Sequence, residues 1–317
     1  MFITKMRQVE VVCAGVLVAD TFVPPLPRLP VAGELMATGD FWHDSGGCAA
    51  NTATALRKLD VQSGVVGKVG IDAGGDFVAQ DLRAKGVDTT GLRRSKTLGT
   101  SETVILPVSG DDRRYIHTFG ANADFRVEDV SREQVAGAKI FYVGGYLILP
   151  GFDPGALREL LAFARCRGVK TVLDVAVTEG GGGWEALEAV LAEVDFFTPN
   201  DHEAHLLTGE VEPRVQAARL LAAGCGTAII TRGEKGAMAA RAGQVLELPA
   251  FSLPMVDGSG AGDAFAAGLI AGLLRDWELG ECLRLASAVG ASACTKLGCT
   301  PGVFTQAEAE NFLKEVR

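Results

Sequence analysis

The stretch from Asp257 to Asp263, Asp-Gly-Ser-Gly-Ala-Gly-Asp, combines an anion-binding turn with a carboxylate. Its three glycines let the backbone turn tightly and bring N–H groups close to a ligand. The apolar segment 264–274 that follows predicts a buried helix, whose N-terminal amides and dipole would attract an anion. The carboxylate of Asp263 could accept a proton from an attacking hydroxyl. A plain turn with a capping aspartate would have the same residues.

A second pair of glycines precedes another small-residue segment near the N-terminus. Gly46 and Gly47 come before residues 48–59, and Asn51 falls in the first turns of the helix that we expect there. The amide of Asn51 could bind a polyol while the glycines allow the ligand to approach closely. It could equally satisfy nearby backbone groups, so the sequence leaves both interpretations open.

The first apolar run, residues 11–19, is typical of a strand buried on both faces, and it ends at Asp20. Open α/β sheets bind ligands beyond the carboxyl ends of their strands, so Asp20 could contact a substrate. Position alone nevertheless favours a turn or capping aspartate.

Asn200 and Glu203 follow a further expected strand, 194–198, and stand one helical turn apart. Both side chains could bind waters of a magnesium ion, which keeps much of its hydration shell. A capping box uses the same two residue types at the same spacing, and the pattern alone favours the cap.

Two of these motifs resemble the signatures of the PfkB carbohydrate kinases, the ribokinase-like family. Residues 257–265 are similar to the Asp-Thr-Thr-Gly-Ala-Gly-Asp-Ala-Phe motif near the C-terminal end of that family, with Gly258 where the family usually has Thr. Residues 46–51, followed by Gly64, Gly67 and 70–72, resemble its N-terminal signature. The two signatures occur in the family's order, so the resemblance covers nearly the whole chain.

Four shorter segments are also similar to parts of that family. Pro199 to Glu203 resembles its magnesium and phosphate motif, and Thr231 to Gly236 resembles its nucleotide loop, although a hairpin turn would also explain the latter. Gly120-Ala121-Asn122 resembles a segment that follows the lid in fructokinase-like members. Residues 287–298 are placed like the wall against which the adenine lies.

The resemblance implies an ATP-dependent kinase that phosphorylates a primary hydroxyl of a small sugar. Asp263 would be the general base, and the amides of Gly260, Ala261 and Gly262 would stabilise the transferring phosphoryl group. The other implied roles are sugar binding by Asp20, Gly46, Gly47, Asn51 and Asn122, nucleotide binding by Asn200, Thr231, Gly233, Gly236, Gly260 and Gly262, magnesium binding through water by Asn200 and Glu203, and binding of a monovalent cation such as K⁺ by Asp257.

The order of the expected elements predicts an α/β fold, with a mainly parallel sheet covered by helices on both faces. Strands expected at 140–143, 171–175, 194–198 and 227–231 alternate with helices, including those expected at 154–167 and 184–191.

Two regions interrupt this alternation of strands and helices. Residues 21–42 are rich in proline and predict short strands and turns, and residues 99–119 predict two antiparallel strands around a polar turn at 109–112. In similar kinases such strands form a small β lid over the sugar, and lids often pair in a homodimer. We therefore expect residues 1–317 to form a single ribokinase-like domain with a lid.

The composition is typical of a globular protein of the cytoplasm. Of the 317 residues, 48% are hydrophobic and 22% are charged, as in a globular protein. A net charge of −9 without a basic cluster argues against a nucleic-acid partner. The seven cysteines include no Cys-x-x-Cys pair and suit a reducing compartment. Lys5 and Arg7 precede an apolar run that carries Glu10, which we interpret as a strand rather than a signal peptide, and no run is long enough to span a membrane.

The acceptor sugar is not defined by these motifs. Ribokinases usually have Lys where this chain has Cys48, so the motif argues less strongly for ribose and leaves fructose, a keto-deoxy sugar acid or another sugar open. A nucleoside kinase similar to adenosine kinases is the nearest alternative, because those enzymes share both signatures. A catalytically silent sugar- or nucleotide-binding protein is a third interpretation, against which the presence of Asp263 and its glycines argues.

Overall fold

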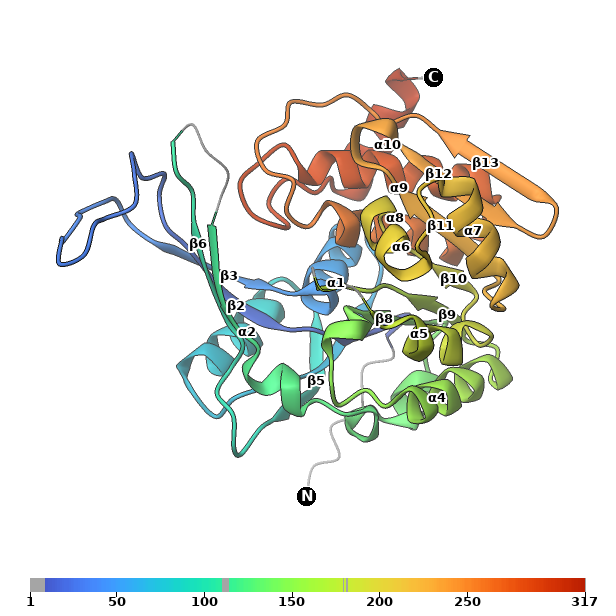
Figure 1. The fold of residues 1–317 in the computed structure, drawn as a ribbon, viewed down its shortest axis with the longest axis horizontal. Helices are drawn as coiled ribbons and strands as arrows, with labels where there is room; N and C mark the ends of the chain where they lie inside the picture. The colour runs from blue at the N-terminus through green and yellow to red at the C-terminus, as the bar shows by residue number, and fades with distance from the viewer. Residues whose placement is uncertain (1–8, 110–113, 179, 181, 317) are drawn as a thin grey trace.

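Residues 9–109, 114–178, 180 and 182–316 are described by the computed structural model, which is shown in Figure 1. The predicted turn residues 110–112 and the N-terminal Lys5 and Arg7 lie outside the described residues. Among the helices of the described part, none combines the length and the apolar character needed to cross a membrane.

The larger sheet has nine strands within the described ranges, in the order β13-β12-β11-β10-β9-β8-β1-β4-β5. The pairs from β11 through to β5 are parallel, whereas β12 pairs antiparallel with both β11 and β13. This confirms the prediction of a mainly parallel sheet. The strands are β1 Val11–Gly15, β4 Ser63–Val69, β5 Asp88–Arg94, β8 Ile140–Gly144, β9 Lys170–Leu173, β10 Phe196–Phe197, β11 Thr227–Thr231, β12 Ala237–Arg241 and β13 Gln244–Leu248.

A smaller sheet projects from the main body and has the order β3-β2-β6-β7 (Figure 1). The β2–β3 and β6–β7 pairs are antiparallel, whereas β2 and β6 pair parallel. Its strands come from the two regions that interrupt the alternation and from the residues beside them. They are β2 Val18–Phe22, β3 Trp42–Gly46, β6 Glu102–Leu106 and β7 Arg114–Thr118.

The sequence predicted one strand over the apolar run 11–19. In the structure this run is divided between the two sheets. β1 ends at Gly15, whose positive φ of 147° is rarely adopted by other residues. A Cβ at Gly15 would lie 2.1 Å from the carbonyl oxygen of Gly144, so only glycine fits there. The chain then enters β2, and Asp20 therefore lies inside a strand of the smaller sheet rather than beyond the end of a strand of the larger one.

Three other sequence expectations differ from the structure. Most of residues 21–42 form no regular strand, and Leu26 makes only an isolated bridge to Val108. The strand expected at 194–198 shortens to two residues. The sequence analysis did not identify β5 or β13, because their alternating or polar sequences lack a continuous apolar run.

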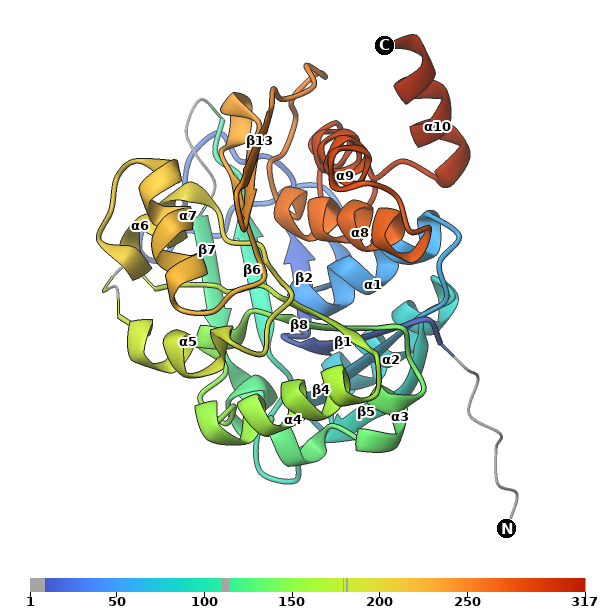
Figure 2. The ribbon, with the colours of Figure 1, turned by 90° about the vertical axis from the view of Figure 1, so that its right-hand side faces the viewer.

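Helices cover both faces of the larger sheet, as predicted. Alternate residues of β1 point to opposite faces, with Cys13 in one core cluster and Ala14 in the other. The first cluster includes α1, α2, α8 and α9, and the second includes α3 to α7; Figure 2 shows α1, α8 and α9 together on one side. The helices are α1 Cys48–Lys58, α2 Ala73–Ala84, α3 Arg132–Ala136, α4 Pro154–Cys166, α5 Trp184–Leu191, α6 Asp201–Thr208, α7 Pro213–Ala222, α8 Ala261–Leu274, α9 Leu279–Ala293 and α10 Gln306–Glu315.

Helix α8 is buried from Ala264 through Leu273, which confirms the buried helix predicted from its uniformly apolar sequence. Two of its glycines allow α9 to pack closely. A Cβ at Gly268 would lie 2.7 Å from the Cα of Ala286, and one at Gly272 would lie 2.8 Å from the Sγ of Cys282. This packing holds α8 against α9.

Candidate active site

Asp263 lies in the first turn of α8, where it meets Asn51 of α1. The side-chain amide of Asn51 donates a hydrogen bond of 2.8 Å to Oδ2 of Asp263. The hydroxyl of Thr52 donates to the backbone carbonyl of the same aspartate over 3.3 Å. The structure thus brings the predicted base and a predicted sugar-binding residue into direct contact.

Burial raises the pKa of Asp263 to about 7, although hydrogen bonds from Asn51 and Cys48 act in the opposite direction. A carboxylate with this pKa is partly protonated at neutral pH and can both accept and return a proton. The Asp263 environment therefore suits a general base.

The turn before Asp263 leaves backbone amides at the N-terminus of α8. Gly260 is the N-cap and has a positive φ of 73°, and a Cβ there would lie 2.5 Å from the carbonyl oxygen of Cys299. No other residue type would fit this turn without displacing residue 299. Gly262 has no atom within 4 Å of the position that a Cβ would take, so the space on that side of its Cα is open. Ala261 and Gly262 both line a cavity.

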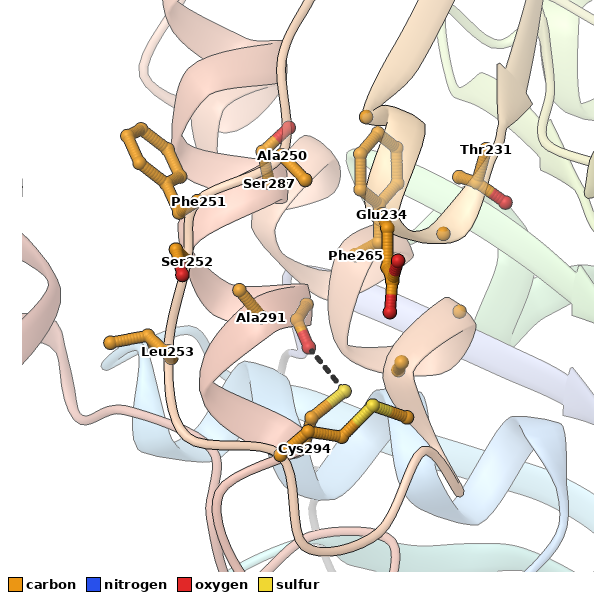
Figure 3. Close-up of a pocket in the computed structure, with 16 residues that line it drawn as sticks. Thr231, Glu234, Ala250, Phe251, Ser252, Leu253, Phe265, Ser287, Ala291 and Cys294 are labelled. Atoms are coloured by element: carbon orange, nitrogen blue, oxygen red, sulfur yellow. Dashed lines mark hydrogen bonds between the residues drawn. The ribbon is translucent and has the colours of Figure 1, made fainter.

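This cavity has a volume of about 500 Å³ and lies between the end of β11, the segment 250–255 and helices α8 and α9. Figure 3 shows Ala250, Phe251 and Leu253 on one side and Thr231 on the other. Its lining is mainly apolar, which suits a planar aromatic group such as a nucleobase. Within the segment 287–298, compared above with an adenine wall, the lining residues are Ser287, Gly290, Ala291 and Cys294.

Three predicted nucleotide-loop residues, Thr231, Gly233 and Gly236, also line the cavity. β11 and β12 form an antiparallel pair, so the loop is a hairpin as well, and the two interpretations are compatible. Gly236 has a φ of 84°, and a Cβ there would lie 2.0 Å from the carbonyl oxygen of Leu248. Only glycine allows β12 and the chain after β13 to meet at this point.

A second group of polar residues comes from the smaller sheet and its junction with α1. Asp20 is only 8% exposed, and burial raises its pKa to about 6. A Cβ at Gly46 would lie 1.8 Å from Oδ2 of Asp20, so this carboxylate occupies the space that the missing side chain leaves. Gly47 caps α1 with a φ of 91°, and a Cβ there would lie 2.5 Å from the carbonyl oxygen of Val16.

Asn122 is buried, and its amide is fully engaged with the backbone of Leu17. Its Oδ1 accepts from the Leu17 amide at 3.1 Å, and its Nδ2 donates to the Leu17 carbonyl at 2.9 Å. The side chain thus holds the connection between β1 and β2 in place. This structural use was not anticipated from the sequence.

Asn200 and Glu203 form the capping box that the sequence allowed, at the start of α6. The Asn200 side chain accepts from the Glu203 amide at 2.8 Å, and Oε2 of Glu203 accepts from the Asn200 amide at 2.9 Å. Burial raises the pKa of Glu203 to about 7, and the negative charge of Asp263 contributes to the shift. Glu203 therefore belongs electrostatically to the Asp263 site as well as to the cap.

Asp174, just after β9, is a member of the site that the sequence analysis missed. Burial and the carboxylates of Glu203 and Asp263 raise its pKa. One ligand atom each of Cys48, Asp174 and Asp263 lies within 4.8 Å of the others. The sequence predicted a strand at 171–175 with Asp174 inside it, whereas β9 ends at Leu173 and places Asp174 just beyond the carboxyl end of the strand.

Asp257 is 2% exposed and accepts backbone hydrogen bonds from two segments. The amides of Ser259 and Gly298 donate to it at 2.8 and 3.0 Å. The carboxylate therefore ties the glycine turn before α8 to the loop after α9.

Comparison with known proteins agrees with this geometry. Residues 9–306 match the sequence model of the family described as pfkB family carbohydrate kinase. The chain is 26% identical over 296 residues to a ribokinase of Haemophilus influenzae, covering 91% of this chain and 94% of the relative. It is 28% identical over 321 residues to a fructokinase-2 of Oryza sativa subsp. japonica, covering 96% of this chain and 94% of the relative.

A solved structure has the same fold. The ribokinase of Arabidopsis thaliana, complexed with ribose and ATP, superposes with a TM-score of 0.84 at 24% identity, covering 96% of this chain and 99% of the other. This confirms the ribokinase-like fold predicted from the motifs. Because the family model spans nearly all of the described residues, the chain belongs to the pfkB family of carbohydrate kinases.

Proposed function

We propose that this enzyme uses ATP to phosphorylate a primary hydroxyl of a small sugar, with Asp263 as the general base. The observation that carries the proposal is the position of Asp263 in the first turn of α8, where it follows the cavity-lining Gly262 and accepts a hydrogen bond from Asn51. Such a carboxylate lies between a site for the nucleotide and a site for the acceptor, as in-line phosphoryl transfer requires.

In the proposed reaction, Asp263 accepts the proton of the sugar hydroxyl as that oxygen attacks the γ-phosphorus of ATP. The bond between the γ-phosphorus and the β,γ-bridging oxygen breaks, and ADP leaves. The amides of Gly260, Ala261 and Gly262 stabilise the charge on the transferring group, and the dipole of α8 adds to their effect. Asn51 keeps the carboxylate oriented through its 2.8 Å hydrogen bond.

On the acceptor side, Asp20 and Asn51 bind hydroxyls of the sugar, and Gly46 and Gly47 allow the sugar to approach the backbone. The Oδ1 atom of Asn51 is buried and makes no hydrogen bond to any described residue, so it is available to a sugar hydroxyl. Asn122 acts in this proposal by holding the β1–β2 connection beneath the sugar.

On the nucleotide side, Thr231, Gly233 and Gly236 contact ATP, which fills the cavity of about 500 Å³. Asn200 and Glu203 hold waters of Mg²⁺, with Asp174 nearby. The donor set fits this ion, because Glu203 and Asp263 raise the pKa of Asp174, Asp263 raises that of Glu203, and a hard divalent cation would relieve this repulsion among carboxylates. Mg²⁺ neutralises charge on the phosphates. Asp257 would bind a monovalent cation such as K⁺ at the turn before α8.

We propose further that the chain is a single domain whose smaller sheet acts as a lid over the sugar. Apolar side chains on this sheet and its loop are exposed, including Ile116 at 64% and Leu35 at 97%. These side chains would pair two lids in a homodimer. A cytoplasmic location suits the seven cysteines, all of which are free.

The test is release of ADP with ATP, Mg²⁺ and K⁺ across a panel of pentoses, hexoses, keto-deoxy sugar acids and nucleosides. We expect activity on one sugar, and Asp263→Asn should retain ATP binding but lose about 10² to 10⁴ in kcat. Asp276→Asn is the matched control, because Asp276 is exposed and its left-handed backbone accepts asparagine. Near-normal turnover by Asp263→Asn would show that Asp263 is not the general base. Activity on nucleosides alone would show that the acceptor is a nucleoside rather than a sugar.

A further inference from the structure

The smaller sheet aligns acidic and polar residues in a row on the face that carries Asp20. In the strand register, Asp20 is directly opposite Asp44 of β3 and Thr103 of β6, and Thr103 is opposite His117 of β7. Residues in register on neighbouring strands point to the same face of a sheet. This row of Asp44, Asp20, Thr103 and His117 thus places the carboxylates of Asp20 and Asp44 side by side, at the part of the smaller sheet that we take as the sugar site.

The thiol of Cys299 shows how close these carboxylates come to the reacting end of the site. Burial raises the pKa of this thiol, and the negative charges of Asp20, Asp263 and Asp44 raise it further. A single buried atom is therefore within electrostatic reach of all three. The proposed base and the two carboxylates of the sheet surround one small region.

The positive group that acts on Asp20 is the ammonium group of Lys85, which is bound to other carboxylates. Lys85 donates to Asp44, and its Nζ lies 2.6 Å from Oδ2 of Asp81. Asp81 in turn accepts from the hydroxyl of Ser45 at 2.6 Å. Asp44 and Asp81 thus share the Lys85 ammonium group, and Asp20 interacts with it only at longer range. The ammonium group of Lys58 also interacts with Asp44 at longer range, but it already donates to three backbone carbonyls. Three carboxylates therefore face two ammonium groups, which leaves an excess of negative charge.

Within the described part of the chain, no second cation offsets this charge at Asp20. Lys85 is the one positive group that lowers the pKa of Asp20, against burial and the charge of Asp44. The ring of His117 hydrogen-bonds to Thr103 through Nδ1 at 3.0 Å, and burial lowers its pKa, so it is neutral at pH 8. The row accepts hydrogen bonds and repels anions.

We propose that the acceptor pocket selects uncharged sugars and polyols and discriminates against sugar acids and sugar phosphates. This inference rests on the proposed function, because it takes the region around Asp20 as the acceptor site. Carboxylates accept hydrogen bonds from neighbouring hydroxyls of a neutral polyol. A carboxylate or phosphate on the ligand would face the same groups without a free cation to pair with.

The test compares pairs of ligands that share one carbon skeleton and differ in charge. D-Fructose and 2-keto-D-gluconate are such a pair, as are D-ribose and D-ribonate. Binding of each to the full-length protein is measured by calorimetry at pH 8, so that the result does not depend on turnover. Like charges a few ångströms apart near a protein surface predict at least about 100-fold weaker binding of the acid in the pair that binds.

A charge-neutralising variant tests whether this row of residues causes the preference for neutral ligands. Asp44→Asn removes one carboxylate and leaves Lys85 less neutralised, so the preference for the neutral ligand should narrow by about 10-fold. Glu10→Gln is the matched control, because Glu10 pairs with Lys139 at 2.9 Å on the protein surface and is not in the row. The control should keep the wild-type preference.

Binding of a neutral sugar in preference to its acid, narrowed in Asp44→Asn only, would support the proposal. Equal or tighter binding of an acid by the wild-type protein would overturn it even if Asp44→Asn does not fold. Binding of neither class would overturn it too, because no acceptor site would then exist. ADP release is measured separately and tests the kinase proposal. Efficient phosphorylation of a sugar acid would support the kinase proposal but contradict the proposed selectivity for uncharged sugars.

Discussion

The side-chain amide of Asn51 donates to the carboxylate of Asp263 at 2.8 Å, although 212 positions separate the two residues in sequence. Asn51 belongs to α1 and Asp263 to α8, and these two helices pack in the same core cluster. The contact joins the glycine pair that precedes α1 to the glycine turn that precedes α8. The proposed sugar site and the proposed phosphoryl site therefore meet at one hydrogen bond.

The pH profile of kcat/KM should report the ionisation of Asp263. Its pKa is raised to about 7 by burial, and only the ionised carboxylate can accept a proton. Activity should therefore rise about tenfold per pH unit below pH 7 and level off above it. Glu203 also has a pKa raised to about 7 and interacts with Asp263. The acidic side of the profile can therefore have a steeper slope than the ionisation of one group would give. A profile that stays flat down to pH 5 would contradict the base assignment.

Asp263→Asn should make the protein more stable at pH 8 while it abolishes most turnover. The folded-state pKa of about 7 lies above the ordinary value of 3.8, so the folded protein binds more protons between these pH values than the unfolded chain. Stability from this group is then present near pH 4 and is lost as pH rises towards 7. Removing the charge should recover about 1–3 kcal/mol at pH 8.

Urea unfolding of the wild type and Asp263→Asn at pH 8 and near pH 4 checks this prediction. The gain should nearly vanish at the lower pH, because the folded protein then holds the carboxyl protonated and no buried charge remains for the substitution to remove. A gain of the same size at both pH values would show that the effect is packing rather than charge.

Gly46→Ala should weaken sugar binding with little effect on ATP. The added Cβ would lie 1.8 Å from Oδ2 of Asp20, so the carboxylate would have to move. We expect KM for the sugar to rise by about tenfold or more, which corresponds to the loss of one charge-assisted hydrogen bond. Steady-state kinetics with each substrate varied in turn measure both constants. Gly280→Ala in α9, where a Cβ would meet no atom within 4 Å, should leave both unchanged.

Glu203→Gln should separate the capping role of this residue from its proposed role at Mg²⁺. Glutamine can also close a capping box, so the melting temperature should change little. The concentration of Mg²⁺ that gives half-maximal activity should rise by about tenfold, because a carboxylate near the ion is lost. Glu308→Gln is the matched control, since Glu308 forms the same box with Thr305 in α10. Equal Mg²⁺ dependence in the two variants would leave Glu203 as a cap alone.

Local sequence was sufficient for the features that depend on neighbouring residues. The uniformly apolar segment after Asp263 predicted a buried helix, and the structure contains it as α8. The segment Trp184–Leu191 was predicted as a helix with the bounds that α5 has. The motifs at 46–51 and 257–265 indicated the family, which the match over residues 9–306 confirms. These features repeat along the chain with the period of a helix or stand within a few residues of one another.

Features that depend on distant contacts required the tertiary structure. The apolar run 11–19 contains no local signal for its division, which is imposed where Gly15 meets the carbonyl oxygen of Gly144. Asp174 lies near Asp263 because β9 belongs to the larger sheet, and the hydrogen bonds of Asn122 to Leu17 join residues 105 positions apart.

The sequence alone therefore determined the residue types for phosphoryl transfer and the helices that carry several of them. The tertiary structure decided which of these side chains meet and how their ionisation changes. The pKa of Asp263 moves from 3.8 to about 7 because folding removes the carboxylate from water. Burial and charge are set by neighbours far away in sequence, so residue type and spacing cannot supply them.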